Sequence, residues 1–341
     1  MTTFSRILLL FAWIAVAACD QGSQRGSRAG DPDRRGAPDA ASPDPTSATP
    51  SSGSPADAPI PLPDKPGSLR FAVIGDSGRG SSEQYQLAQQ MVIQRERFPF
   101  TFVLMLGDNI YDSWTPEDYA AKFERPYKAL LDDDVKFYAA RGNHDGREQW
   151  LYPGFNTGGQ RYFTFTKAEG MLKPLVGKTV QFFAIDTVDL DGAQLEWLRQ
   201  QLEASKADWK ISFFHHPVYT SGRYAWSSIL RRRTLEPIFV EGGVDVAFSG
   251  HEHLYERFIP QQGVNYFVSG AAGAVRVGDL RPTSRTAAGF DTDLSFMLVE
   301  ISGDTLHFQT ISRLGVIVDS GSFERRDASV SRLESQAFIL K

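Results

Sequence analysis

Five short apolar runs, each ending in a cluster of Asp, Asn or His, constrain the fold of this chain more than any other feature. The runs begin at Phe71, Phe102, Phe137, Ile211 and Val244. The polar clusters after them occupy residues 75–78, 107–111, 142–145, 215–217 and 250–253. In open α/β folds, ligands bind beyond the carboxyl ends of the strands. The pattern therefore predicts that five strand ends meet at one site.

The order of the expected elements indicates an α/β or α+β layered fold. From Leu69 onward, apolar runs alternate with amphipathic segments, which is the order of βαβ units. Helices are expected at residues 81–95, 115–130 and 194–202. Strands are expected at 161–166 and 180–185, and at the end of the chain at 264–268, 294–301, 305–311 and 315–319. Two packed mixed β-sheets flanked by helices accommodate this order, whereas a TIM barrel would require helices between the last strands.

Two local features have simple structural interpretations. The glycines that open four of the polar clusters are expected to permit tight turns; they are Gly75, Gly107, Gly142 and Gly250. The basic run Arg231–Arg233 is expected to be the solvated face of a helix.

The N-terminus reads as a secretory signal. Arg6 precedes the apolar run Ile7–Ala18, which is too short to cross a bilayer. Small residues precede Cys19, the only cysteine, and this resembles the bacterial lipoprotein cleavage box. We therefore expect a lipoprotein signal peptide at residues 1–19 and an exported, membrane-anchored bacterial lipoprotein, lipidated at Cys19, that faces the periplasm or the exterior. The alternative is an ordinary signal peptide cut near Ala18, with Cys19 incidental.

The next segment, residues 20–67, has a composition that disfavours folding. It is made mainly of Pro, Ser, Asp, Gly and Ala and contains ten of the nineteen prolines. Such a segment cannot bury enough apolar surface to offset the entropy of ordering, so a disordered tether is expected. The folded domain is expected at residues 68–328, followed by a tail at 329–341.

Composition also limits the partners. Apolar residues make up 41% of the 341 residues, which is ample for a core. The formal charge of −5 disfavours a nucleic acid binding surface, because proteins with such surfaces are usually basic along one face. Contact with a membrane is expected only through the lipid anchor.

Two histidines separated by one residue, His251 and His253, follow the last of the five runs. Behind a strand and a glycine, both rings can point into the mouth of a sheet, where a metal ion would fit. A lone His is more often a core or surface residue, so a metal site needs further ligands. The other four clusters contain them as Asp, Asn and His.

Taken in order, the clusters resemble the calcineurin-like metallophosphoesterases. The motifs are Gly75-Asp76-x-Gly78, Gly107-Asp108-x-x-Tyr111, Gly142-Asn143-His144-Asp145, His215-x-Pro217 and Gly250-His251-x-His253. Tyr111 makes the chain similar to the purple acid phosphatases, and its compact single domain resembles their small, tartrate-resistant type. The motif Asp186-Thr187, followed by Gln194-Leu195-x-Trp197-Leu198, is also similar to that type. The resemblance runs from about Leu69 to Tyr255 and implies a metallophosphoesterase-like four-layer sandwich.

This resemblance implies two metals that share Asp108. One would be held by Asp76, Asp108, Tyr111 and His253, and the other by Asp108, Asn143, His215 and His251. A phenol of ordinary pKa, about 10, ionises near neutral pH only beside a strong Lewis acid, so the first set favours Fe(III). Neutral Asn and imidazole donors suit a divalent ion in the second site: Fe(II), Zn(II) or Mn(II).

The implied activity is hydrolysis of phosphomonoesters by a metal-bound hydroxide. Asn143 and His144 would contact the substrate. His144 would donate a proton to the leaving alcohol, with a structural hydrogen bond as its alternative role. His216 stands where these enzymes often have an aromatic residue, and it either touches the substrate or packs. The chain departs from the family between residues 220 and 226, which contain no His but do contain Arg223 and Tyr224.

Two other functions are compatible with the same residues. One is a phosphodiesterase that acts on nucleotides or phospholipid head groups. The other is a non-catalytic metal-binding lipoprotein. The ligand set is complete, which favours an acid phosphatase or related phosphoric ester hydrolase over a decayed site.

Overall fold

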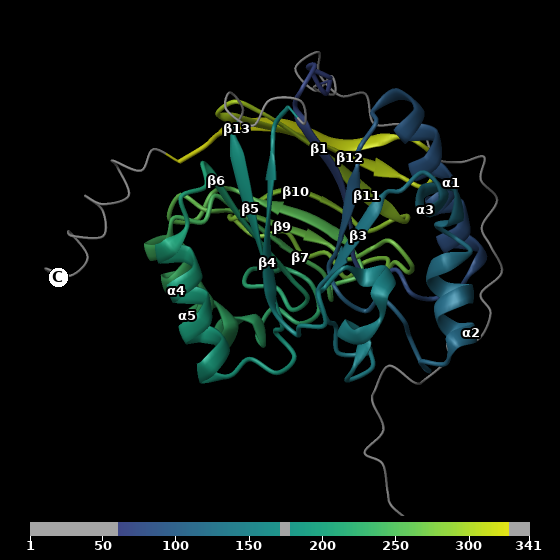
Figure 1. Cartoon of the computed structure of the whole chain (residues 1–341), viewed down its shortest axis with the longest axis horizontal. Coiled ribbons are helices and arrows are strands. Elements are labelled where there is room, and N and C mark those ends of the chain that lie inside the picture. Colours follow the sequence, from purple (N-terminus) through teal and green to yellow (C-terminus); the bar gives the residue numbers. More distant parts are fainter. Residues whose placement is uncertain (1–60, 171–177, 327–341) are drawn as a thin grey trace, which may run out of the picture. The chain divides into compact units, whose positions relative to one another are not determined.

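The computed structural model describes residues 61–170 and 178–326, all within one compact unit (Figure 1). The expected signal peptide with Cys19, most of the expected tether and the expected tail lie outside these residues. At the end of the expected tether, the backbone N–H groups of Asp64 and Lys65 donate hydrogen bonds to the Glu300 carboxylate, at 2.8 and 2.7 Å. The chain is therefore attached to the domain before its first strand begins.

Six strands of the described chain form the first sheet, in the order β13-β12-β11-β1-β2-β3. Their bounds are β1 Leu69–Ile74, β2 Phe102–Met105, β3 Lys136–Ala139, β11 Ser295–Ser302, β12 Thr305–Ser312 and β13 Ile317–Glu324. Strands β1, β2 and β3 are parallel, and β1, β11, β12 and β13 pair antiparallel. Gly303, with a φ of +64°, turns the chain between β11 and β12, which correspond to the strands expected at 294–301 and 305–311.

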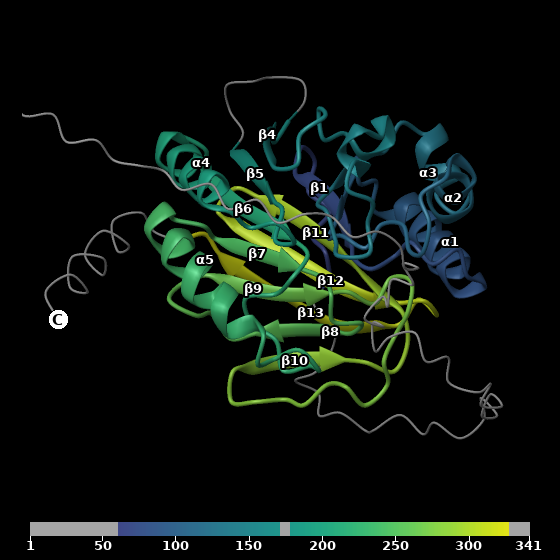
Figure 2. The ribbon, with the colours of Figure 1, turned by 90° about the horizontal axis from the view of Figure 1, so that it is seen from below.

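Seven described strands form the second sheet, in the order β10-β8-β9-β7-β6-β5-β4. Their bounds are β4 Phe163–Ala168, β5 Thr179–Ile185, β6 Trp209–Phe214, β7 Val246–Ser249, β8 Tyr255–Phe258, β9 Asn265–Ser269 and β10 Thr286–Phe290. Strands β5, β6, β7 and β9 are parallel, and the outer pairs are antiparallel (Figure 2). Both sheets are thus mixed, as predicted.

The layers follow from strands that are apolar on both faces. In β1, Phe71 and Val73 face the core between the sheets, whereas Ala72 and Ile74 face the core beneath the helices. This is why the sequence shows continuous apolar runs rather than alternation. Across the inner core, the rings of Phe71 and Phe182 meet edge to face at 5.5 Å.

Helices cover the outer faces of both sheets (Figure 1). Beside the first sheet lie α1 Ser82–Arg97, α2 Pro116–Tyr119 and α3 Lys128–Asp132, and beside the second lie α4 Gly192–Ala204 and α5 Ser228–Gly242. The result is the four-layer arrangement predicted from the sequence. No helix of the described chain is both long and apolar enough to span a membrane.

The prediction of a single helix at residues 115–130 is wrong. The segment instead forms three short helices: α2, the π-helix Ala120–Glu124 and α3. Pro126 has no backbone N–H and its ring clashes with the preceding turn, so the helix is interrupted there. The aromatic and aliphatic side chains of this segment are nevertheless buried, since Phe123, Tyr127 and Leu130 are each at most 1% exposed.

The interpretation of Arg231–Arg233 as a solvated face is also wrong for two of its three residues. The run does lie in a helix, α5, but only Arg233 is exposed. The Arg232 guanidinium lies 4.7 Å from the centre of the Tyr219 ring. Arg231 is half-buried and points back along the helix.

Candidate metal centre

The expected ligands lie at the carboxyl ends of parallel strands from both sheets. In the first sheet, Asp76 follows β1, Asp108 follows β2 and Asn143 follows β3. In the second sheet, His215 follows β6, and His251 and His253 follow β7. Because parallel strands end at the same edge, the folding of the two sheets brings all these residues together.

Three of the side chains form one group. The Tyr111 hydroxyl lies 3.3 Å from Asp76 Oδ1, to which it donates a hydrogen bond, and 3.1 Å from His253 Nε2. His253 Nε2 is 3.5 Å from Asp76 Oδ1. All three side chains are at most 4% exposed. A carboxylate, a phenol and an imidazole therefore face one another away from solvent.

A second group is centred on His215. Its Nδ1 atom lies 3.0 Å from the carbonyl oxygen of Leu106, which can only accept, so Nδ1 carries a proton. The other ring nitrogen, Nε2, lies 2.9 Å from Asn143 Oδ1 and 3.4 Å from Asp108 Oδ1. The same Nε2 is 3.2 Å from Nδ1 of His251. Electron-pair donors converging in this way are the arrangement that a cation satisfies.

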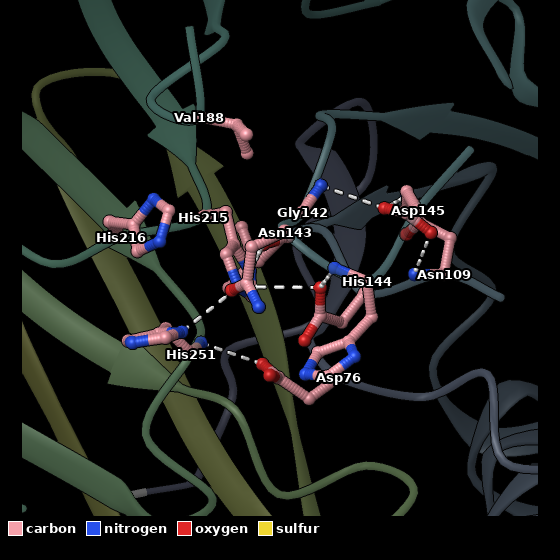
Figure 3. A network of polar contacts seen from close by, with 12 residues as sticks. Asp76, Asn109, Gly142, Asn143, His144, Asp145, Val188, His215, His216 and His251 are labelled. Atoms are coloured by element: carbon pink, nitrogen blue, oxygen red, sulfur yellow. Dashed lines mark hydrogen bonds and ion pairs between the residues drawn. The ribbon is translucent and has the colours of Figure 1, made fainter. Parts of the chain in front are cut away.

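The two groups are continuous. Ligand atoms of Asp76, Asp108 and His215 all lie within 4.8 Å of one another. The backbone N–H of His251 donates to Asp76 Oδ2 at 2.8 Å, which connects the first group to a residue of the second (Figure 3). All seven residues expected to hold metals thus meet at one site.

The backbone at three of these residues lies in the left-handed region that favours glycine. The φ angle is +55° at Asp76, +52° at Asp108 and +70° at His251. Each such conformation costs on the order of 1 kcal/mol in a residue with a side chain and persists only where the surroundings enforce it. The site is therefore held in a conformation that local sequence preference does not favour.

The glycines before the ligands allow close approach of the loops, and Gly107 also has a φ of +90°, which favours glycine at this turn. The other three, Gly75, Gly142 and Gly250, do not have positive φ. A Cβ on Gly142 would overlap the backbone N of Asp108, and one on Gly250 would overlap Asp76 Oδ2. These loops pack so closely that no side chain fits.

Burial makes the acidic groups poor anions unless a cation is present. It raises the pKa of the Asp76 carboxyl to about 7 and that of the Tyr111 phenol well above its ordinary value. Burial also lowers the pKa of His251, which stays a neutral donor. Buried carboxylates and phenolates need a compensating positive charge, so this donor set fits bound metal ions.

Asp145 is a buried carboxylate whose role the sequence did not indicate. Its Oδ1 accepts hydrogen bonds from the backbone N–H groups of Asn109 and Ile110 at 2.7 and 2.9 Å. Its Oδ2 accepts from the N–H of Gly142 at 2.7 Å. It therefore fastens the loop after β2 to the loop after β3, and these two loops carry Asp108 and Asn143.

Asn143 and His144 occupy the accessible side of the site. Asn143 is exposed and His144 is half-exposed, whereas Asp76, Asp108 and His215 are buried. The His144 ring lies 4.8 Å from the Tyr111 ring, and its backbone N–H donates to Asp108 Oδ1 at 2.9 Å. A molecule arriving from solvent would meet these two residues first.

His216 lies within the same cluster of rings. Its ring centre is 4.5 Å from that of His251, and only 7% of the residue is exposed. Its Nδ1 lies 3.2 Å from both the hydroxyl and the carbonyl oxygen of Thr187. Burial lowers the pKa of His216 to about 2, so the ring is neutral. The Asp186-Thr187 motif thus orients a histidine beside the expected metal ligands.

Two further carboxylates hold the loop after His215 in place. Glu252 stands between His251 and His253 in the sequence, and Glu256 follows them. Glu252 accepts the backbone N–H of Tyr224 at 2.7 Å, and Glu256 accepts that of Ser221 at 2.8 Å. Both carboxylates are at most 1% exposed. The Tyr224 ring consequently lies 4.5 Å from the His251 ring. The sequence did not indicate these roles, because an acidic residue close to a histidine is first interpreted as a possible metal ligand.

Comparison with known proteins agrees with this geometry. Residues 69–255 match the family of calcineurin-like phosphoesterases. Purple acid phosphatase 17 of Arabidopsis thaliana is 28% identical over 245 residues, which cover 64% of this chain and 72% of that protein. Human tartrate-resistant acid phosphatase type 5 is 25% identical over 247 residues, which cover 60% of this chain and 73% of that protein.

Solved structures share the fold. The purple acid phosphatase PPD1 of yellow lupin superposes with a TM-score of 0.58 and 18% identity, covering 80% of this chain and 56% of that one. GAP50, the anchor in the inner membrane complex of Plasmodium, superposes with a TM-score of 0.65 and 20% identity. The match covers 79% of this chain and 94% of that one. Together with the family match, these likenesses show that the chain belongs to the calcineurin-like phosphoesterases, which hydrolyse phosphate esters at a metal centre, and has purple acid phosphatases among its homologues.

Proposed function

We propose that this chain hydrolyses phosphomonoesters with two metal ions that share Asp108. The observation that supports this most is the meeting of five loops from two sheets around buried oxygen and nitrogen donors. Ligand atoms of Asp76, Asp108 and His215 lie within 4.8 Å of one another, and bound cations would compensate the charge of the buried carboxylates.

The two groups of side chains suit different ions. Fe(III) is proposed for the group with two carboxylates and a phenol: Asp76, Asp108, Tyr111 and His253. Burial raises the pKa of the Tyr111 phenol further, so its phenolate requires a strongly charged ion. Fe(II), Zn(II) or Mn(II) is proposed for Asp108, Asn143, His215 and His251, whose donors are mostly neutral.

When bound, two such ions would act as Lewis acids toward the phosphate and would lower the pKa of water. His144 is proposed to donate a proton to the oxygen of the leaving alcohol, since its ring is half-exposed beside Tyr111. Asn143 is exposed next to His144, and its Oδ1 lies 2.9 Å from His215 Nε2. We propose that Asn143 also contacts the substrate. His216 is neutral and lies 4.5 Å from His251, where it forms part of the wall of the site.

The test is a substrate panel on protein of measured metal content. We expect a higher kcat/KM for aryl and alkyl phosphomonoesters than for the corresponding diesters. A preference for diesters would assign the chain to phosphodiesterases of nucleotides or phospholipid head groups. Protein that contains two metals per chain and cleaves neither class would instead be a non-catalytic metal-binding protein.

Replacing Tyr111 by Phe tests the proposed iron directly. Phenolate bound to Fe(III) absorbs visible light by charge transfer, so we expect purified protein to be coloured and Tyr111→Phe to be colourless. Tyr119→Phe is the matched control, because this tyrosine is half-buried in the helical layer, stacked on Tyr152 at 4.3 Å, and should leave the colour unchanged. A colourless wild-type protein with full activity and only zinc or manganese would refute the iron assignment.

We propose that the protein is exported and is anchored to the membrane by a lipid attached to Cys19. Radiolabelled palmitate is expected to label the wild-type chain in bacteria and to leave Cys19→Ala unlabelled, because this is the only cysteine. Gln21→Ala is the control for a change near the cleavage site and should keep the label. Equal labelling of wild type and Cys19→Ala would remove the basis for a lipid anchor.

A further inference from the structure

Arg231 is a partly buried cation close to the metal centre. It lies in the first turn of α5, and its guanidinium folds back so that Nη1 is 3.4 Å from the carbonyl oxygen of Ser227. Among the described residues, no carboxylate pairs with it, and burial alone lowers the pKa of its guanidinium. A cation in the first turn of a helix also faces the positive end of the helix dipole. Within the described chain, its charge is therefore uncompensated.

A short chain of contacts connects Arg231 to the expected metal ligands. The Ser227 backbone N–H donates to the carbonyl oxygen of Tyr224 at 3.0 Å, and the Tyr224 ring is 4.5 Å from that of His251. In the part of the chain that the structure describes, the Arg231 guanidinium makes no hydrogen bond to the ring of His216 or of His251.

The segment that carries Tyr224 is rigidly placed. Glu252 holds the Tyr224 backbone N–H at 2.7 Å, and Thr220 also donates to this carboxylate at 3.3 Å. A second guanidinium, that of Arg276, lies 5.8 Å from the Tyr224 ring. The wall beside His251 thus carries a guanidinium close to the Glu252 carboxylate and is preorganised, which reduces the entropy lost when an anion binds.

Arginine in this setting suits a phosphate group. Its planar guanidinium presents several N–H donors that match the oxygens of phosphate, and partial burial strengthens such bonds. The phosphate that is cleaved must contact the cations held by the ligands. Arg231 contacts none of those ligands, so it is placed for a different anionic group of the same molecule.

We propose that Arg231 binds a second phosphate on the leaving group, so that the preferred substrates are esters with two phosphate groups. This inference rests on the proposed phosphatase function of the neighbouring site. Arg231 is a specificity-determining residue in this scheme and takes no part in the chemical step.

The experiment compares two substrates that differ only in the second phosphate. These are propyl phosphate and propanediol bisphosphate with its phosphates on the two end carbons. Wild-type protein should have the lower KM for the bisphosphate. Arg231→Gln should raise the KM for the bisphosphate roughly tenfold, as expected for losing one charged hydrogen-bonding partner, and leave kcat and the KM for propyl phosphate nearly unchanged. Arg231→Lys should restore part of the difference.

Arg233→Gln is the matched control, because it removes the same charge from an exposed position of the same helix and should change neither KM. Binding of the corresponding phosphonates, which cannot be hydrolysed, is measured in parallel by calorimetry. Equal increases in KM for both substrates in Arg231→Gln would mean that Arg231 binds the cleaved phosphate, and no increase would mean that it binds none. Either result overturns the proposal. Inactivity of the wild type on both substrates would instead count against the phosphatase function, while the phosphonate titrations still report on Arg231.

Discussion

Replacement of Asp108 by Asn is expected to lower kcat/KM for phosphomonoesters by about a thousandfold or more. Asp108 is the residue proposed to be shared by both metal ions, and metals contribute several kcal/mol of transition-state stabilisation, each 1.4 kcal/mol of which is about tenfold in rate. Asn keeps the shape and tolerates the φ of +52° at this position but removes the negative charge. Metal content should fall from two ions per chain to one or none, as measured by elemental analysis alongside the kinetics.

The structure offers a matched control for this change. Asp112 has a φ of +68° in the same loop but is exposed, so Asp112→Asn makes the same chemical substitution in a similar backbone conformation away from the donors. It should retain both metal content and activity. An Asp108→Asn protein that is folded, still binds two metals and is fully active would show that the carboxylate does not bridge them.

Replacement of His144 by Ala should produce a loss that depends on the leaving group. Proton transfer from a positioned histidine typically contributes about a hundredfold to ten-thousandfold in rate. We expect a loss in this range for alkyl phosphates, whose alkoxide leaving groups need the proton. The loss should be much smaller for nitrophenyl phosphate, because its leaving group is already a stable anion.

The half-exposed position of His144 makes this comparison practicable, since little packing is lost. His307→Ala is the control, because His307 lies in β12 within the ladder opposite Glu300 and is not among the residues that meet at the site. Equal losses for alkyl and nitrophenyl esters in His144→Ala would refute proton donation and favour a structural hydrogen bond.

Much of the site was predictable because each expected ligand follows an apolar run by only a few residues. A run that is apolar at every position, such as Leu104-Met105-Leu106 before Asp108, is typical of a strand buried on both faces, as the strands of parallel sheets are. Parallel strands place the residues beyond their carboxyl ends at one edge of the sheet. The meeting of Asp76 with His253 then requires only that the two sheets pack face to face.

The roles that the sequence did not predict depend on contacts distant in the chain. Asp145 reads as part of a motif, but its function is to accept backbone N–H groups more than 30 residues earlier, at Asn109 and Ile110. Glu252 likewise acts on the backbone of Tyr224, 28 residues away. No local pattern indicates which of several acidic residues will be buried and which will bind water.

The burial of Arg231 likewise could not be predicted from the sequence. Three consecutive arginines in a helix look alike in sequence, and the usual outcome for such a run is a solvated face. Helical geometry turns successive residues by about 100°, so a single run can contain one exposed cation, Arg233, and one half-buried cation, Arg231. Only the packing of α5 against the second sheet distinguishes them.

The sequence by itself determined the layered α/β class, the strand ends that carry the ligands, and the residue types around the metals, since periodicity and side-chain chemistry are local properties. The tertiary structure alone decided the left-handed backbone at Asp76, Asp108 and His251, the carboxylates that fasten the loops, and the partial burial of Arg231. These depend on which distant atoms exclude water from a group or accept its hydrogen bonds. That is a property of the packed chain and is absent from any single segment of it.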